Sequence, residues 1–357
     1  MRRLLHSHHP FRIFAVSGSL TVLALGLVYY YMGAQAAFLA LVLIAVEITF
    51  SFDNAIINAR ILMTMSAFWQ KMFITVGMLI AVFGMRLVFP ILVVMITAGL
   101  SWGSVVNLAL NDPAQYAREL EDSYISIASF GGMFLLMLCL HFFFDASRKI
   151  RWIDIIEKPL QKVGKWWTYG VVCFLILVGV AALPVNEHPV ETFIAGFCGI
   201  ATYLAVHGLA ELFSRKYDIA STTGKAVQRA GMAGFMSFLY LEVLDASFSF
   251  DGVIGAFAIT TDVVLIAIGL GIGAFWVRSL TIFMVRRHVL AAYRYLEHGA
   301  HYTIGLLAGV LLLGIFFHIS EFIAGIMGIL VIAASVVSSV TKRKREESHG
   351  HSASARS

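Results

Sequence analysis

Ten long apolar stretches follow one another along this 357-residue chain, and they limit what it can fold into. With 59% hydrophobic and 13% charged residues, a soluble fold of this length could not bury so much apolar surface. The sequence therefore predicts an all-α polytopic membrane protein of about 9–10 transmembrane helices in the lipid bilayer. For the last two stretches, which are short, a re-entrant hairpin is the alternative. The stretches cover approximately residues 13–32, 36–59, 72–98, 125–145, 168–184, 190–213, 231–258, 262–285, 302–317 and 320–340.

Lysine and arginine gather in alternate loops of this arrangement. The loops 146–167, 214–230 and 286–301 are basic, whereas 99–124 and 184–191 contain few Lys or Arg residues. The positive-inside rule then predicts cytoplasmic N- and C-termini, and we expect a multi-pass protein of the bacterial inner membrane. We expect no nucleic-acid binding, because the basic residues lie between apolar stretches rather than on a soluble basic face.

A short acidic motif occurs twice within the apolar sequence. The first copy is Glu47-Ile-Thr-Phe-Ser-Phe-Asp53-Asn54, and the second is Glu242-Val-Leu-Asp245-Ala-Ser-Phe-Ser-Phe-Asp251. When the shared Phe-Ser-Phe-Asp segments are aligned, Glu47 lies opposite Asp245, and Glu242 is an additional acid. Ionisable groups in hydrocarbon cost several kcal/mol, so a doubled acidic motif indicates one composite functional site.

The two copies are expected to run in opposite directions through the membrane. With the predicted topology, this arrangement indicates an inverted-topology repeat, with the two motif helices antiparallel at the midplane. Arg86 and Arg278 support the repeat, because each lies one span after its acidic motif. The predicted divisions are an N-terminal tail and first transmembrane helix (1–35), a first repeat half (36–189), a second repeat half (190–341) and a disordered cytoplasmic tail (342–357).

Helix geometry sets a condition on this composite site. Glu242 and Asp245 are three residues apart and share a helical face, but Asp53 follows Glu47 by six residues and Asp251 follows Asp245 by six, which is about 240° around an ideal helix. They can share one ion only if both helices unwind locally, at Ser51–Asn54 and at Ser249–Gly252. The alternative is that some acids face other partners, such as Arg86 and Arg278.

A set of hard oxygen ligands without a thiolate favours Mn²⁺, Ca²⁺ or Mg²⁺. His207 and Glu211 are four residues apart on one helical face and are predicted to relay protons or bind a softer metal, with interhelical hydrogen bonding as the alternative. The predicted metal ligands are Glu47, Asp53, Asn54, Glu242, Asp245 and Asp251, and the supporting residues are Ser51, Ser249, Arg86, Arg278, His207 and Glu211.

Both motifs, the two arginines and the segment Tyr295-Leu296-Glu297-His298-Gly299 resemble the TerC-like integral membrane proteins, a family named for tellurium resistance. The resemblance covers roughly residues 36–340. It implies a place in the LysE-type superfamily of exporters and implies manganese export. The sequence departs from the family in its larger number of spans and in Gly252, where a polar residue is frequent.

We therefore predict a divalent cation transporter that exports Mn²⁺, with Ca²⁺ as the alternative cation, and we predict neither an enzyme nor a catalytic cofactor. Two alternatives remain open: an intramembrane enzyme of the aspartyl type using Asp53 and Asp251, and a non-transporting membrane partner in metal or tellurite stress. The coupling ion and the oligomeric state, a homo-oligomer included, are left open by the sequence.

Overall fold

The computed structural model describes residues 10–165, 167–220, 229–257, 259–317, 319 and 321–354. Within these ranges it leaves undescribed the side chains of residues 10–12, 213–220, 250, 251, 254, 321, 322, 324 and 347–354. The described chain is helical throughout and contains no β-strand in those ranges. The all-helical prediction is therefore confirmed.

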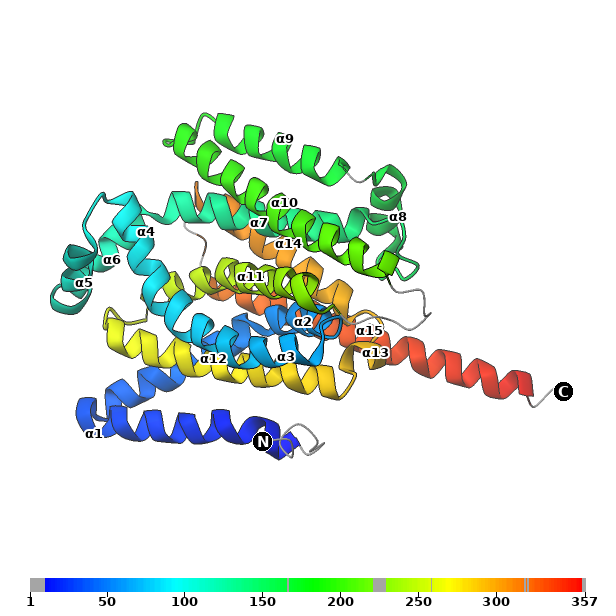
Figure 1. Cartoon of the computed structure of the whole chain (residues 1–357), viewed down its shortest axis with the longest axis horizontal. Coiled ribbons are helices and arrows are strands. Elements are labelled where there is room, and N and C mark those ends of the chain that lie inside the picture. The colour runs from blue at the N-terminus through cyan, green and yellow to red at the C-terminus, as the bar shows by residue number, and fades with distance from the viewer. Residues whose placement is uncertain are drawn as a thin grey trace.

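The first helix, α1 (Pro10–Phe50), consists of two helical arms joined at Gly33. Gly33 has φ +88° and ψ 178°, a backbone conformation that a residue with a Cβ rarely adopts. The chain turns there, and the second arm returns alongside the first (Figure 1). The arms correspond to the first two predicted stretches, and α2 (Phe52–Leu62) continues the second arm after Ser51.

One long helical segment from Ala67 to Thr97 follows. It contains α3 (Ala67–Met72), the π-helical segments η2 (Phe73–Gly77) and η3 (Ile80–Val88), and α4 (Phe89–Thr97). π-Helical turns widen a helix locally and often occur at functional sites. This segment carries Arg86 at the second π-helical part.

The remaining helices complete the bundle. They are α5 (Trp102–Asn111), α6 (Pro113–Asp122), α7 (Tyr124–Phe144), α8 (Asp154–Val163), α9 (Thr168–Ala182), α10 (Pro189–Ala220), α11 (Gly231–Phe257), α12 (Val263–Arg286), α13 (Val289–Ala292), α14 (Leu296–Gly314) and α15 (Glu321–Ser354). The backbone is helical as far as Ser354, so most of the segment 342–357 that was predicted to be disordered continues α15. Its lysines, arginines and glutamates are good helix formers, which accounts for the extension.

Seven helices of the described residues are long and apolar enough to cross a membrane, or eight if the bent pair α8–α9 counts as one span. The protein is therefore a multi-pass membrane protein with about seven to eight candidate spans. This count takes the two arms of α1 as one helix, although they match two predicted stretches, so the number of nine to ten spans stays a prediction. The last two stretches form separate helices, α14 and α15, that each pass this length and composition test.

Helix packing places the two acidic motifs in the middle of the bundle. Helix α1 packs along α12, while α7 packs against both α10 and α14, and α14 also packs against α15. In Figure 1, α9 and α10 lie at one side of the molecule and the first arm of α1 at the other, with α2 and α11 between them. The largest core cluster joins side chains of α2, α7, α10, α11 and α14.

Candidate functional site

The first acidic motif lies at the junction of α1 and α2. Ser51 interrupts the helix with φ −94° and ψ 16°. The helical hydrogen bonds nevertheless continue across it, from Ser51 N to Glu47 O at 3.0 Å and from Ala55 N to Ser51 O at 3.1 Å. Only Ser51 therefore departs from helical geometry in the segment Ser51–Asn54, because the backbone hydrogen bonds of the helix continue on both sides of it.

The second acidic motif lies within α11, which is continuous from Gly231 to Phe257. The local unwinding of Ser249–Gly252 that a shared ion would require is therefore absent from this backbone. Glu242, Asp245 and Ser249 are buried on this helix. The backbone of Asp251 belongs to α11, but its side chain lies outside the described residues.

Glu47 forms an ion pair with Arg86 of η3. The Ser51 hydroxyl also donates to Glu47 Oε1 at 3.1 Å. Arg86 in turn donates from Nε to the carbonyl oxygen of Leu270 in α12 at 3.1 Å. One guanidinium therefore joins the end of α1, η3 and α12, in a position that is buried from solvent.

Asp245 faces residues from both halves of the chain. Asn54 Nδ2 donates to Asp245 Oδ1 at 2.7 Å, and Arg278 Nη2 lies 3.9 Å from Asp245 Oδ2. Arg278 also donates to the carbonyl oxygen of Gly77 at 3.0 Å. Its guanidinium carbon lies 3.6 Å from the centre of the Phe73 ring, which is the geometry of a cation–π contact.

Glu242 is the exception in this cluster. Its side chain is buried, and neither carboxylate oxygen has a hydrogen-bond partner in the part of the chain that the structure describes. It lies against Gly77, where an added Cβ would collide with Glu242 Oε1 and lie 3.5 Å from Arg278 Nη1. Arg278 Nη1 likewise has no hydrogen-bond partner among the described residues. A buried carboxylate in this state carries a large desolvation cost, which suggests that it has another partner in a different state of the protein.

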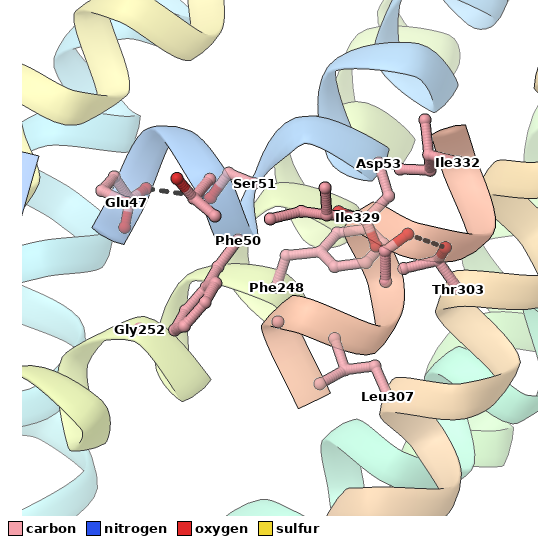
Figure 2. Close-up of a pocket in the computed structure, with 13 residues that line it drawn as sticks. Glu47, Phe50, Ser51, Asp53, Phe248, Gly252, Thr303, Leu307, Ile329 and Ile332 are labelled. Atoms are coloured by element: carbon pink, nitrogen blue, oxygen red, sulfur yellow. Dashed lines mark hydrogen bonds between the residues drawn. The ribbon is translucent and has the colours of Figure 1, made fainter. Parts of the chain in front are cut away.

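A cavity of about 40 Å³ lies between the first motif, Phe248 and Gly252 of the second motif, and helices α14 and α15. A cavity of this size holds one or two water molecules or a small ion, and is too small for an organic substrate. In Figure 2, Glu47 and Ser51 lie toward one side, and Asp53 and Thr303 toward the other. The lining residues are Glu47, Thr49, Phe50, Ser51, Asp53, Phe248, Gly252, Thr303, Leu307, Gly325, Gly328, Ile329 and Ile332.

The acids of the first motif do not converge on one point. Asp53 follows Glu47 by six residues on nearly continuous helix, so the two side chains leave the axis in different directions. No group of three or more His, Cys, Asp or Glu side chains is arranged to hold a metal ion within the described ranges. The structure thus matches the alternative in which the acids face Arg86 and Arg278. The full ligand set stays a prediction, because Asp251 contributes no described side chain.

A family model described as "Protein of unknown function (DUF475)" matches residues 52–346, which is most of the chain. The chain belongs to the DUF475 family. The matched region begins at Phe52, beside Asp53, and includes the second motif and both arginines. No curated protein and no solved structure matches the chain. Membership of DUF475 assigns no activity, and the resemblance to TerC-like proteins stays a prediction.

His207 and Glu211 lie apart from the two motifs of this DUF475 protein. They line a separate cavity of about 510 Å³ that also contains His141, Tyr203 and Arg229. The ring centres of His141 and His207 are 4.4 Å apart, and His141 Nδ1 forms a hydrogen bond with the Tyr203 hydroxyl at 2.6 Å. The hydrogen bond is made by His141 and Tyr203, so the roles of His207 and Glu211 stay predictions.

Three groups at the site have no counterpart among the predicted residues. The carbonyl oxygens of Gly77 and Leu270 bind the two arginines, and Thr303 lines the cavity from α14. None of these has a sequence signal, because tertiary packing alone brings them to the motifs. Asn58 did have one, since it follows Asn54 by one helical turn and is equally buried.

Proposed function

We propose that this protein is a secondary transporter that exports a divalent cation across the bacterial inner membrane, with Mn²⁺ as the preferred ion. The observation that carries the proposal is the balance of buried charge. Two guanidinium groups, Arg86 and Arg278, are buried beside the two motifs. The motifs contribute four described buried carboxylates, Glu47, Asp53, Glu242 and Asp245. When all of these described groups are ionised, they carry an excess of two negative charges, which is the charge of one divalent cation; an ionised Asp251, whose side chain is not described, would add to that excess.

The cavity beside the motifs supports a small ion rather than a molecule. It is bordered by the carboxylates of Glu47 and Asp53 and by the hydroxyls of Ser51 and Thr303. These are hard oxygen donors, which suit Mn²⁺, Ca²⁺ or Mg²⁺ better than soft metals. The TerC resemblance is what favours manganese among them.

The arginine contacts support an inverted repeat as the basis of transport. Arg86 is paired with an acid of the first half and binds the carbonyl of Leu270 in the second. Arg278 lies near an acid of the second half and binds the carbonyl of Gly77 in the first. Two arginines with exchanged contacts are what a pseudo-twofold axis between the halves would produce.

These contacts suggest how the cation would be exchanged. In the described conformation the arginines occupy Glu47 and Asp245, so these two carboxylates are neutralised without a cation. Cation entry would release these acids from the arginines, and relative movement of the halves would expose the site to the other side. We further propose that protons return in exchange, because protonated carboxylates lose their attraction for the cation.

Reconstitution of the full chain in liposomes tests this proposal. We expect Mn²⁺ flux, measured with an enclosed metal-sensitive dye, that falls at least tenfold in Asp53→Asn and Glu242→Gln variants. The exposed Glu187→Gln variant is the matched control and should transport normally. Absence of flux for Mn²⁺, Ca²⁺ and Zn²⁺ beside a working control transporter would overturn the assignment. Efflux that persists after the proton gradient is collapsed would refute the proton coupling alone.

A further inference from the structure

A second cavity, of about 740 Å³, lies at one end of the helix bundle and is unrelated to the acidic motifs. Its walls come from the places where spans begin or end. They include Arg60 near the end of α2, most of the residues directly after α7 and after α12, and Ser339, Lys342, Arg343 and Glu346 of α15. A cavity built from helix ends lies at a boundary of the membrane, where lipid head groups are present.

The side chains around this cavity carry an excess of positive charge. Six cationic side chains line it, namely Arg60, Arg148, Lys149, Arg294, Lys342 and Arg343. Three acids also line it, namely Asp145, Glu297 and Glu346. The excess is therefore three positive charges, on the side that the sequence predicts to be cytoplasmic.

The acids of the cavity are already engaged by its arginines. Glu297 Oε1 lies 3.3 Å from Arg60 Nε and 3.2 Å from Arg148 Nη1. Glu346 lies 3.3 Å from Arg294. By contrast, no ion pair to Lys149 or Lys342 is found in the described part of the chain, and both lysines are exposed. The lysines are therefore available to an anion that enters the cavity.

We propose that this cavity binds the phosphate group of an anionic phospholipid. Basic pockets between helix ends at the cytoplasmic side of membrane proteins suit anionic lipid head groups. Apolar side chains complete the wall, since Ile150 and Leu290 line the same cavity and suit the glycerol and acyl part of a lipid. A free phosphate ion would use only the cationic groups, so these apolar walls favour a lipid.

Lipid binding to the purified full chain in detergent tests the proposal. Short-chain phosphatidylglycerol is titrated and bound lipid is counted by native mass spectrometry, with phosphatidylcholine and inorganic phosphate as comparison ligands. We expect saturable phosphatidylglycerol binding that weakens at least tenfold in the Lys149→Gln/Lys342→Gln/Arg343→Gln variant. Binding should also weaken as salt rises, because exposed charges are screened.

A second triple variant provides the matched control. Lys158→Gln/Lys162→Gln/Lys165→Gln removes the same charge from exposed positions in and after α8 that do not line the cavity. It should bind phosphatidylglycerol like the parent protein. Equal loss in both variants, or unchanged binding in the cavity variant, would refute the site. Inorganic phosphate binding as tightly as phosphatidylglycerol would show an anion site and overturn the lipid assignment.

Discussion

Arg86 and Glu47 form a buried ion pair in which the side chains are 3% and 2% exposed. The pair joins η3 to the end of α1. Arg86 also links η3 to α12, because its Nε donates a hydrogen bond to the carbonyl oxygen of Leu270. In a low-dielectric interior such a pair is stabilising only relative to its broken form, because either charge alone would remain buried without compensation.

Replacing Arg86 alone should therefore lower the stability of the protein far more than replacing Arg86 and Glu47 together. We expect Arg86→Met to lower the free energy of unfolding by about 3–5 kcal/mol, and Arg86→Met/Glu47→Leu to recover much of that loss. Thermal unfolding in detergent measures both. The exposed Arg118→Met variant is the control and should change stability by less than about 0.5 kcal/mol. A double variant less stable than Arg86→Met would contradict this account of the pair.

Gly77 provides a test of the position of Glu242. An alanine Cβ at Gly77 would collide with Glu242 Oε1, the end of a side chain that can shift, so we expect Gly77→Ala to be destabilising by about 1 kcal/mol. Gly77→Ala/Glu242→Ala should lose most of that penalty, which a double-mutant cycle measures. Gly179→Ala in α9 is the control, because nothing lies within 4 Å of its Cβ, and there alanine should be neutral or stabilising. Additive effects of the two substitutions would place Glu242 elsewhere.

The hydrogen bond from Asn54 to Asp245 joins the two motifs directly. Asn54→Leu should lower stability by about 1.5–3 kcal/mol, because the acceptor is a charged group left in a buried position. Asn54→Asp should be at least as harmful, since it places a second carboxylate against Asp245. Unfolding measurements on both variants check the order, and the exposed Asn107→Ala should have little effect. Greater stability of Asn54→Asp than of Asn54→Leu would show that the donor role of Asn54 is unimportant.

The sequence allowed the helices and the charged partners to be anticipated, because these depend on local composition. Long apolar stretches predicted the bundle, and Arg86 and Arg278 were the alternative partners for some of the acids, which the structure identifies as Glu47 and Asp245. The unwinding was not predictable in the same way. Ser249 and Gly252 permit a break but do not require one, and α11 keeps its hydrogen bonds through both residues.

The turn at Gly33 had no signal in the sequence either. Gly33 lies within apolar sequence like many other glycines, yet its positive φ turns the chain between the two arms of α1. The contacts of Arg86 and Arg278 with backbone carbonyls depend on how distant helices pack, which no local pattern encodes. The sequence therefore identifies which charged side chains gather in the middle of the bundle, but it does not predict how those side chains are arranged around one another.

Glu242 is expected to lower the stability of the metal-free protein and to contribute to cation binding. Its buried carboxylate has no hydrogen bond among the described residues, so Glu242→Gln removes a desolvated charge and should raise the thermal unfolding temperature of the metal-free protein, or leave it unchanged. In the parent protein, Mn²⁺ at 100 times its dissociation constant should add about 2.7 kcal/mol, because a ligand that binds only the folded state stabilises it. This increase should disappear in Glu242→Gln and persist in Glu187→Gln. If Glu242→Gln instead destabilises the metal-free protein by several kcal/mol, the carboxylate has a structural partner. If Mn²⁺ stabilises that variant as strongly as the parent, Glu242 does not contribute to cation binding.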